Sequence, residues 1–332
     1  MSNVLVSRRE GLFCPAGDFF IDPRGKVNRA IITHAHSDHA RSGHASYLCS
    51  DNSKPLLKIR LGPKAKIESI PFGKCIRMGD ALVSLHPAGH ILGSSQVRIE
   101  VGGRVWVVSG DYKPQPDRTC ETLEVIKCHG FVTESTFALP VFKWLPEGDV
   151  YTQINHWWMD NAENECPSLL FAYSLGKAQR VLAGVDCSIG PIFIHNAVSQ
   201  FLPVYQHYGA VMPEVKKVNS ASEHNYSKGL ILAPPVVEDS LLLRQFGSAQ
   251  RAFASGWMAI RGLRRRRNLG RGFILSDHAD WNGLLKVILG TEAEVVKITH
   301  GNGDALMRYL LDRGINASLL QGFQPERRDE LV

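Results

Sequence analysis

A run of potential metal ligands directly after an apolar segment constrains this chain more than any other feature of its sequence. The segment VNRAII (27–32) is mostly apolar and predicts a buried strand. Four such ligands follow within six residues, namely His34, His36, Asp38 and His39. Alternate residues of an extended chain point the same way. We therefore expect the first three to share one side, while His39 can turn toward a different position.

The chemistry and spacing of this cluster indicate a metal site. Neutral imidazole and carboxylate groups bind zinc and similar divalent ions. A single tetrahedral ion would not ordinarily take four ligands from so short a stretch, so the cluster favours two adjacent metals. The alternative is a surface loop that is rich in histidine by chance, and the spacing argues against it.

Other predicted strands also end at a histidine or a carboxylate. The segment SQVRIEVGGRVWVVSGD (95–111) predicts a hairpin with a Gly-Gly turn, ending at Asp111. In chain order, the polar residues at strand ends are Asp22, the cluster from His34 to His39, His90, Asp111, Glu134, His278 and His300. Side chains at strand ends can form one polar site from distant parts of a sequence.

The middle of the chain has a different character. From about residue 141, predicted strands and helices alternate, as in SLLFAYSLGKAQRVLAGV (168–185). This alternation predicts an α/β insert between Glu134 and His278. A length of 332 residues also favours two domains.

Composition sets broader limits. The formal net charge of +6 weakly favours an anionic partner, although a mildly basic housekeeping protein fits it as well. The seven cysteines include no CxxC pair, which argues against a disulfide framework and fits a reducing cytoplasm. We find neither a secretory signal pattern nor an apolar run long enough to span a bilayer, so we expect a cytoplasmic protein with no membrane partner.

The motifs FIDP, HAHSDH, AGH and SGD resemble, in this order, those of the metallo-β-lactamase superfamily. Three later motifs, VTESTF, SDHAD and THG, resemble the signatures of its β-CASP nuclease branch. The segments FAYSLGKAQR and FASGWMAIRG are also similar to that branch. Over nearly the whole chain, the sequence most resembles the bacterial ligase-associated DNA exonucleases.

This resemblance implies an α/β (α+β) fold, in which a metallo-β-lactamase αββα sandwich carries an inserted α/β β-CASP domain. Residues 1–140 and 270–332 would form the sandwich, and residues 141–269 the β-CASP domain. The site would lie in the cleft between the two domains.

The resemblance also implies two divalent metal ions, zinc or manganese, and a role for each ligand. His34, His36 and His90 would hold one ion, and Asp38, His39 and His300 the other, with Asp111 as the bridge. Asp22 would orient a ligating imidazole. His86 lies four residues before His90 and could compete as the ligand, but the preceding glycine and the family pattern favour His90.

Cleavage of a phosphodiester also needs an acid for the leaving oxygen. The pKa of histidine lies near working pH, so a non-ligating imidazole beside the metals suits this role. We assign it to His278, with Glu134 holding the ring by a hydrogen bond. The sequence HGN begins at the last ligand, His300. Many RNA-processing relatives carry an acid in this motif. The difference weakens the inference that this chain shares their preference for RNA.

Two basic segments are candidates for contacts with nucleic acid. RGLRRRRNLGRG (261–272) offers Arg261, Arg264 and Arg265, because arginine pairs bidentately with phosphate. SLGKAQR offers Ser174, Lys177 and Arg180 at a predicted helix start, where backbone N–H groups can hold a phosphate. A solvated basic loop is an equal alternative for the arginine run.

The sequence thus predicts a metal-dependent DNA exonuclease that hydrolyses phosphodiester bonds through a dinuclear site. The resemblance implies DNA repair with a DNA ligase, and a helicase as a further functional partner. One alternative is an RNA-processing β-CASP ribonuclease with the same site. A hydrolase of small thioesters or lactams would not need the insert, and a non-catalytic scaffold would not need a complete ligand set.

Overall fold

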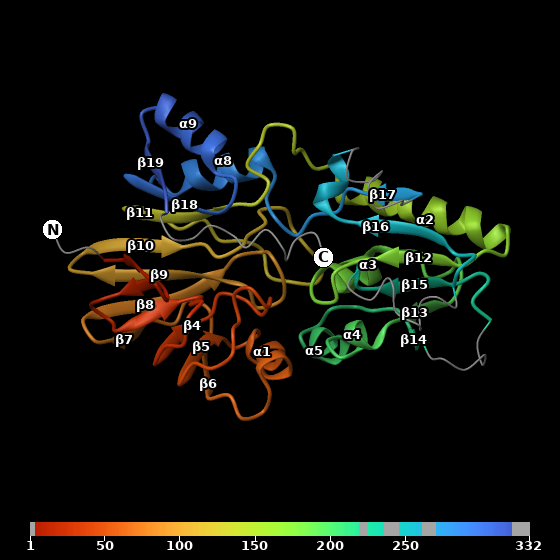
Figure 1. Ribbon diagram of the computed structural model, residues 1–332, viewed down its shortest axis with the longest axis horizontal. Helices are drawn as coiled ribbons and strands as arrows, with labels where there is room; N and C mark the ends of the chain where they lie inside the picture. The colour runs from red at the N-terminus through yellow and green to blue at the C-terminus, as the bar shows by residue number, and fades with distance from the viewer. Residues whose placement is uncertain (1–3, 219–224, 236–245, 261–269, 321–332) are drawn as a thin grey trace. The chain divides into compact units, whose positions relative to one another are not determined.

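The computed structural model describes residues 4–218, 225–235, 246–260 and 270–320. The described chain forms two compact units (Figure 1). The first unit ends at Phe142 and resumes at His278, and the second runs from Lys143 to Asp277. Among the described residues, none of the helices combines the length and the apolar character that a membrane span requires.

The first unit contains two sheets. In order across the first sheet, its strands are β1 (Val6–Arg8), β2 (Gly11–Cys14), β3 (Phe19–Ile21), β4 (Arg29–Ile31), β5 (Ser46–Ser50) and β6 (Ile67–Ile70). In order across the second sheet, they are β19 (Asn316–Leu319), β18 (Val295–Gly301), β11 (Gly130–Ser135), β10 (Arg104–Val108), β9 (Ser95–Val101), β8 (Ala81–Pro87) and β7 (Ile76–Met78). The predicted hairpin is confirmed, because β9 and β10 pair antiparallel around Gly102 and Gly103, which both have positive φ.

These two sheets pack face to face and carry helices on their outer faces. Leu12 of the first sheet and Val132 of the second lie in one buried apolar cluster. The preceding residue Phe131 points to the opposite face of its sheet, where it packs with Leu284 of α8 (Trp281–Gly290) and Leu310 of α9 (Asp304–Asp312). Helix α1 (Lys54–Leu61) lies against β6 (Figure 1). The expected αββα sandwich is therefore confirmed.

The second unit is built on one parallel sheet. In order, its strands are β14 (Lys216–Lys217), β13 (Ile192–Ile194), β15 (Leu230–Ala233), β12 (Ser168–Phe171), β16 (Gln250–Ala254) and β17 (Arg271–Phe273). Its helices are α2 (Glu147–Glu163), α3 (Lys177–Gly184), α4 (Asn196–Ser199), α5 (Leu202–His207) and the 3₁₀ helix η2 (Gly256–Ala259). The continuous apolar runs of β12 and β15 fit a parallel sheet that is covered on both faces.

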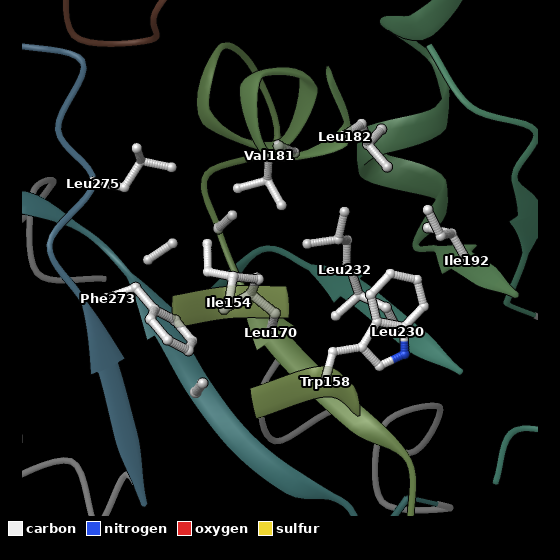
Figure 2. Packing of buried hydrophobic residues seen from close by; sticks show 14 of the residues in the cluster. Ile154, Trp158, Leu170, Val181, Leu182, Ile192, Leu230, Leu232, Phe273 and Leu275 are labelled. Carbon is white, nitrogen blue, oxygen red and sulfur yellow. The ribbon is translucent and has the colours of Figure 1, made fainter. Parts of the chain in front are cut away.

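One core of this unit lies between α2, α3 and the sheet. Figure 2 shows Ile154 and Trp158 of α2 beside Leu170 of β12 and Leu230 of β15. Phe273 of β17 belongs to the same core. The sequence places the end of the insert at residue 269, whereas β17 and the residues up to Asp277 are part of the second unit.

We expect Ile154→Ala to lower the free energy of unfolding of the second unit by about 2–5 kcal/mol, because it leaves a cavity in this core. Ile154 is fully buried, whereas Met159 on the same helix is 40% exposed. Met159→Ala should change stability by less than about 0.5 kcal/mol. Hydrogen exchange of the α2 amides under urea measures both effects, and equal losses in the two variants would contradict this packing.

Candidate metal centre

Strands of the first unit bring the predicted site residues to one edge of each sheet. Asp22 follows β3, the histidine cluster follows β4, His90 follows β8, Asp111 follows β10, Glu134 lies near the end of β11, and His300 lies near the end of β18. Strands β3 and β4 are parallel neighbours, as are β10, β11 and β18. The carboxyl ends of parallel strands meet at the same edge, which explains how residues so distant in sequence converge.

Four of these residues form one compact set, in which His34, His36, His90 and Asp111 each offer a ligand atom within 4.8 Å of the others. Nδ1 of His36 lies 3.1 Å from Nε2 of His34 and 3.0 Å from Nε2 of His90. Tetrahedral zinc bonds of 2.0–2.1 Å to nitrogen separate two ligand atoms by about 3.3 Å. The three ring nitrogens are therefore spaced as ligands of one ion would be.

Asp111 also takes part in a second set, with His39 and His300. Nε2 of His39 lies 3.4 Å from Oδ2 of Asp111, and the rings of His39 and His300 stack with centroids 4.7 Å apart. Asp38 groups with His34 and His39 rather than with His300. Asp111 is thus shared by the two sets, and its role as a bridge stays a prediction.

Two buried atoms of this cluster support a cation there. Nε2 of His39 and Oδ1 of Asp111 have no hydrogen-bond partner among the described residues. Buried polar atoms without partners are rare in folded proteins and call for an explanation. A divalent ion held by these imidazoles and carboxylates would satisfy both atoms, so the donor set fits the metals that the sequence implies.

Asp22 fixes the orientation of His39. Its Oδ2 lies 2.7 Å from Nδ1 of His39, which directs the opposite ring nitrogen toward Asp111. Thr33 holds the same carboxylate through its backbone N–H at 2.8 Å and its hydroxyl at 2.6 Å. Carboxylates that orient ligating imidazoles are a general feature of metal sites. The sequence predicts this role for Asp22 but gives no sign of the contribution of Thr33.

The backbone of the cluster is strained at two points. Asp22 and His300 have φ angles of +42° and +49°, in the left-handed region that residues with a side chain seldom adopt. Ser135 holds His300 in place, because its hydroxyl donates to the carbonyl oxygens of Thr299 and His300. Strain of this kind persists where the surrounding structure dictates it, and it concentrates at functional sites.

Buried carboxylates give the cluster its electrostatic character. Burial lowers the pKa of His39, but Asp111, Asp38 and Asp22 together raise it well above its usual value. Burial raises the pKa of Asp111, yet His39 and other nearby imidazoles hold it well below its usual range. The lowered pKa values keep Asp111 and Asp38 ionised, and a metal ion that binds there would displace the proton that these carboxylates favour on His39. At His34, burial and the neighbouring His39 lower the pKa, which keeps that ring neutral as a ligand must be.

Beside the cluster, Glu134 joins His278 to the backbone next to Asp111. Glu134 is fully buried, with Oε2 2.8 Å from Nδ1 of His278 and Oε1 accepting a 2.7 Å hydrogen bond from the N–H of Tyr112. The rings of His278 and His90 lie 4.5 Å apart. Asp280 caps the start of α8 through a 2.8 Å bond from the N–H of Gly283, which places His278 just before the helix.

His90 lies in the cluster, whereas the competing His86 lies outside it. Gly89 has a φ of +75°, and a Cβ on it would lie 2.2 Å from the carbonyl oxygen of Lys113, so the chain approaches too closely for a side chain. This approach brings His90 beside the segment that follows Asp111. Nδ1 of His86 instead lies 2.9 Å from Oε2 of Glu124, outside the cluster.

Three of the predicted nucleic-acid contacts, Ser174, Lys177 and Arg180, lie in the second unit. Lys177 and Arg180 are 3% and 5% exposed, and both pair with Asp277, at 2.8 Å and 3.1 Å. The carbonyl oxygen of Ser174 accepts a 2.9 Å bond from Gln179. Their role in binding nucleic acid stays a prediction. Arg261, Arg264 and Arg265 fall outside the described residues.

Comparison with known proteins supports the resemblance read from the sequence. The chain is 29% identical to a "Probable DNA ligase" of Opitutus terrae over 94% of its own length and 30% of that protein. It is 24% identical to "Endoribonuclease YSH1" of Candida albicans over 47% of the chain and 19% of that protein. It is 26% identical to "Integrator complex subunit 11" of Danio rerio over 42% of the chain and 23% of that protein. The chain thus spans less than a third of each relative.

No family model matches the chain. A crystal structure of a protein of unknown function from Enterococcus faecalis V583 shares the fold, with a TM-score of 0.58 and 13% identity over 91% of this chain and 80% of that one. The matches to the endoribonuclease and the Integrator subunit confirm the resemblance to the β-CASP branch of the metallo-β-lactamase superfamily.

We expect the chain to bind two divalent ions and His90→Ala to lose at least one of them, because His90 supplies a ring nitrogen to the first set. His86→Ala should keep both ions, since His86 pairs with Glu124 outside that set. Equilibrium dialysis against zinc or manganese, followed by elemental analysis, gives the number bound. Loss of metal in His86→Ala with retention in His90→Ala would reverse the assignment.

Proposed function

We propose that this chain is a metal-dependent phosphodiesterase that acts as a DNA exonuclease in repair, together with a DNA ligase and a helicase. The observation that carries the proposal is the shared position of Asp111. It belongs to both ligand sets, and the Glu134–His278 pair lies directly beside it. The proposal takes the first unit as the metallo-β-lactamase domain and the second as the β-CASP domain of a cytoplasmic enzyme.

The ligand set fits metal-assisted hydrolysis. Bound divalent ions would supply an activated water and would stabilise the negative charge that develops on the phosphodiester. The histidines and Asp111 would fix the separation and orientation of that centre, and Asp22 would keep the His39 ring aligned. Attack at phosphorus breaks the bond to the leaving oxygen, which must then receive a proton.

His278 is placed to deliver that proton. Glu134 accepts from Nδ1–H, which leaves Nε2 as the nitrogen that carries the acidic proton. The buried carboxylate stabilises the protonated ring until the P–O bond breaks, and His278 regains a proton from solvent afterwards. The other carboxylate oxygen of Glu134, Oε1, accepts a hydrogen bond from the N–H of Tyr112. This bond helps to hold the carboxylate in the orientation that contacts His278.

A DNA substrate has more support than RNA. The relative with a DNA-ligase name matches 94% of the chain, whereas the endoribonuclease relative matches 47%. A chain that matches part of a longer ligase-named protein also suggests that the two activities work on the same DNA. An RNA-processing nuclease remains the second candidate, because the endoribonuclease relatives point to it.

The test is a matched digestion of end-labelled single-stranded DNA, double-stranded DNA and RNA of the same sequence, with zinc or manganese. We expect a DNA ladder that grows from one end and is absent with Asp111→Ala, because that substitution removes the shared ligand. Cleavage of RNA alone would assign the chain to the RNA-processing enzymes. Hydrolysis of a small thioester without cleavage of either nucleic acid would refute the proposal.

A second prediction separates the acid from the ligands. His278→Ala should retain its metal and lose about 100- to 10,000-fold in turnover, the usual contribution of a positioned acid. Glu134→Gln should lose activity too, since the ring loses its anionic partner, while metal content is unchanged. Turnover and bound metal are measured on the same preparation. Loss of metal in His278→Ala would show that this residue is a ligand instead.

A further inference from the structure

Arg60 contacts the metal-ligand loop from outside the ligand set. It stands in the last turn of α1, and its Nε donates a hydrogen bond to the carbonyl oxygen of Ala35. Ala35 is fully buried and lies between His34 and His36 in the sequence. The bond therefore reaches the backbone of the loop between two of its candidate ligands.

Among the described residues, Arg60 is the only donor to this carbonyl oxygen. Buried backbone carbonyl groups are nearly always paired, so this bond accounts for one that the loop itself leaves unpaired. The later part of the loop has bonds of its own, since the N–H groups of His39 and Ala40 donate to the carbonyl oxygen of His36. Its first part relies on Thr33 at one end and on Arg60 in the middle.

The orientation of this peptide group matters for the metal centre. Nε2 of His34 and Nδ1 of His36 lie 3.1 Å apart, and a rotation of the Ala35 peptide would move both rings. A metal ion requires its ligand atoms within narrow distance limits. We propose that Arg60 is a positioning residue of the metal centre, which holds the Ala35 peptide through its Nε hydrogen bond. The inference rests on the proposed metal centre.

The charge of Arg60 acts in the opposite direction to its hydrogen bond. Burial lowers the pKa of the guanidinium and Asp38 opposes that shift, so the two side chains interact. A positive charge near a candidate ligand disfavours a cation. Loss of the charge alone would therefore tighten metal binding, whereas loss of the hydrogen bond would weaken it.

Three substitutions separate these contributions. Arg60→Gln places an amide N–H donor where Nε stands and removes the charge. Arg60→Lys keeps the charge but puts a methylene group at that position, and Arg60→Met removes both. Lys58→Met is the matched control, because Lys58 is exposed on the same helix.

The measurement is zinc affinity by competition with a chromophoric chelator. We expect binding to weaken by about 10- to 100-fold in Arg60→Lys, the usual loss when a residue that orients a ligand is replaced. Arg60→Met should weaken it less, because the lost charge offsets part of the lost hydrogen bond. Arg60→Gln and Lys58→Met should bind at least as tightly as the wild type. Thermal unfolding with excess chelator checks that each variant folds. If Arg60→Met does not fold, Arg60→Gln and Arg60→Lys alone decide whether the hydrogen bond supports metal binding.

Wild-type affinity in Arg60→Lys would overturn the inference, and tighter binding in both neutral variants would assign Arg60 a role through charge alone. A wild-type chain that binds no metal would overturn it together with the metal centre. A wild-type chain that binds metal normally but cleaves no phosphodiester would refute the proposed function and leave the inference on Arg60 standing.

Discussion

The buried carboxylate of Asp111 is the interaction on which the site depends. It lies within 3.8 Å of ring nitrogens of His34, His39 and His90. It belongs to both ligand sets and also groups with Glu134 and His278. An ionised carboxylate in this environment is costly unless cations or strong hydrogen bonds surround it. The sandwich meets this requirement by placing several imidazoles around the end of β10. Together with Asp22 and Asp38, which also contact His39, this carboxylate makes the cluster negative enough to favour metal ions.

The scaffold holds this cluster in a conformation that it would not adopt alone. Asp22 and His300 both have left-handed backbone angles, which cost energy in residues other than glycine. The cost is tolerated because parallel strand pairs fix β3 beside β4 and β11 beside β18. Apolar packing between the two sheets stabilises both pairs, and the core on the outer face of the second sheet adds to the support of β11 and β18. A rigid sandwich with a strained polar edge is the arrangement expected where a site must be preorganised.

The sequence predicts the parts of the site that depend on residue type and local spacing. The hairpin of β9 and β10 followed from its Gly-Gly turn, and the metal cluster followed from four potential ligands within six residues. Side-chain contacts between segments that are distant in the sequence leave no comparable pattern of residue type or spacing. Nothing in the sequence around Arg60 indicates that its side chain reaches Ala35, which precedes it by 25 positions. The hydroxyl of Thr33 is equally ordinary in sequence, although it fixes Asp22.

The second unit shows why a basic residue in a sequence is an ambiguous guide to nucleic-acid binding. Lys177 and Arg180 sit at the start of α3, as a phosphate site would require, but their charged groups are buried against Asp277. Removing one partner from a buried ion pair leaves an uncompensated charge and destabilises the fold. Asp277 is also the last residue before the chain returns to the first unit at His278. Weaker DNA binding in a Lys177 or Arg180 variant would therefore mix lost phosphate contacts with disturbed structure. An exposed residue such as Arg271 offers a cleaner probe of nucleic-acid contacts, because its replacement leaves this buried network intact.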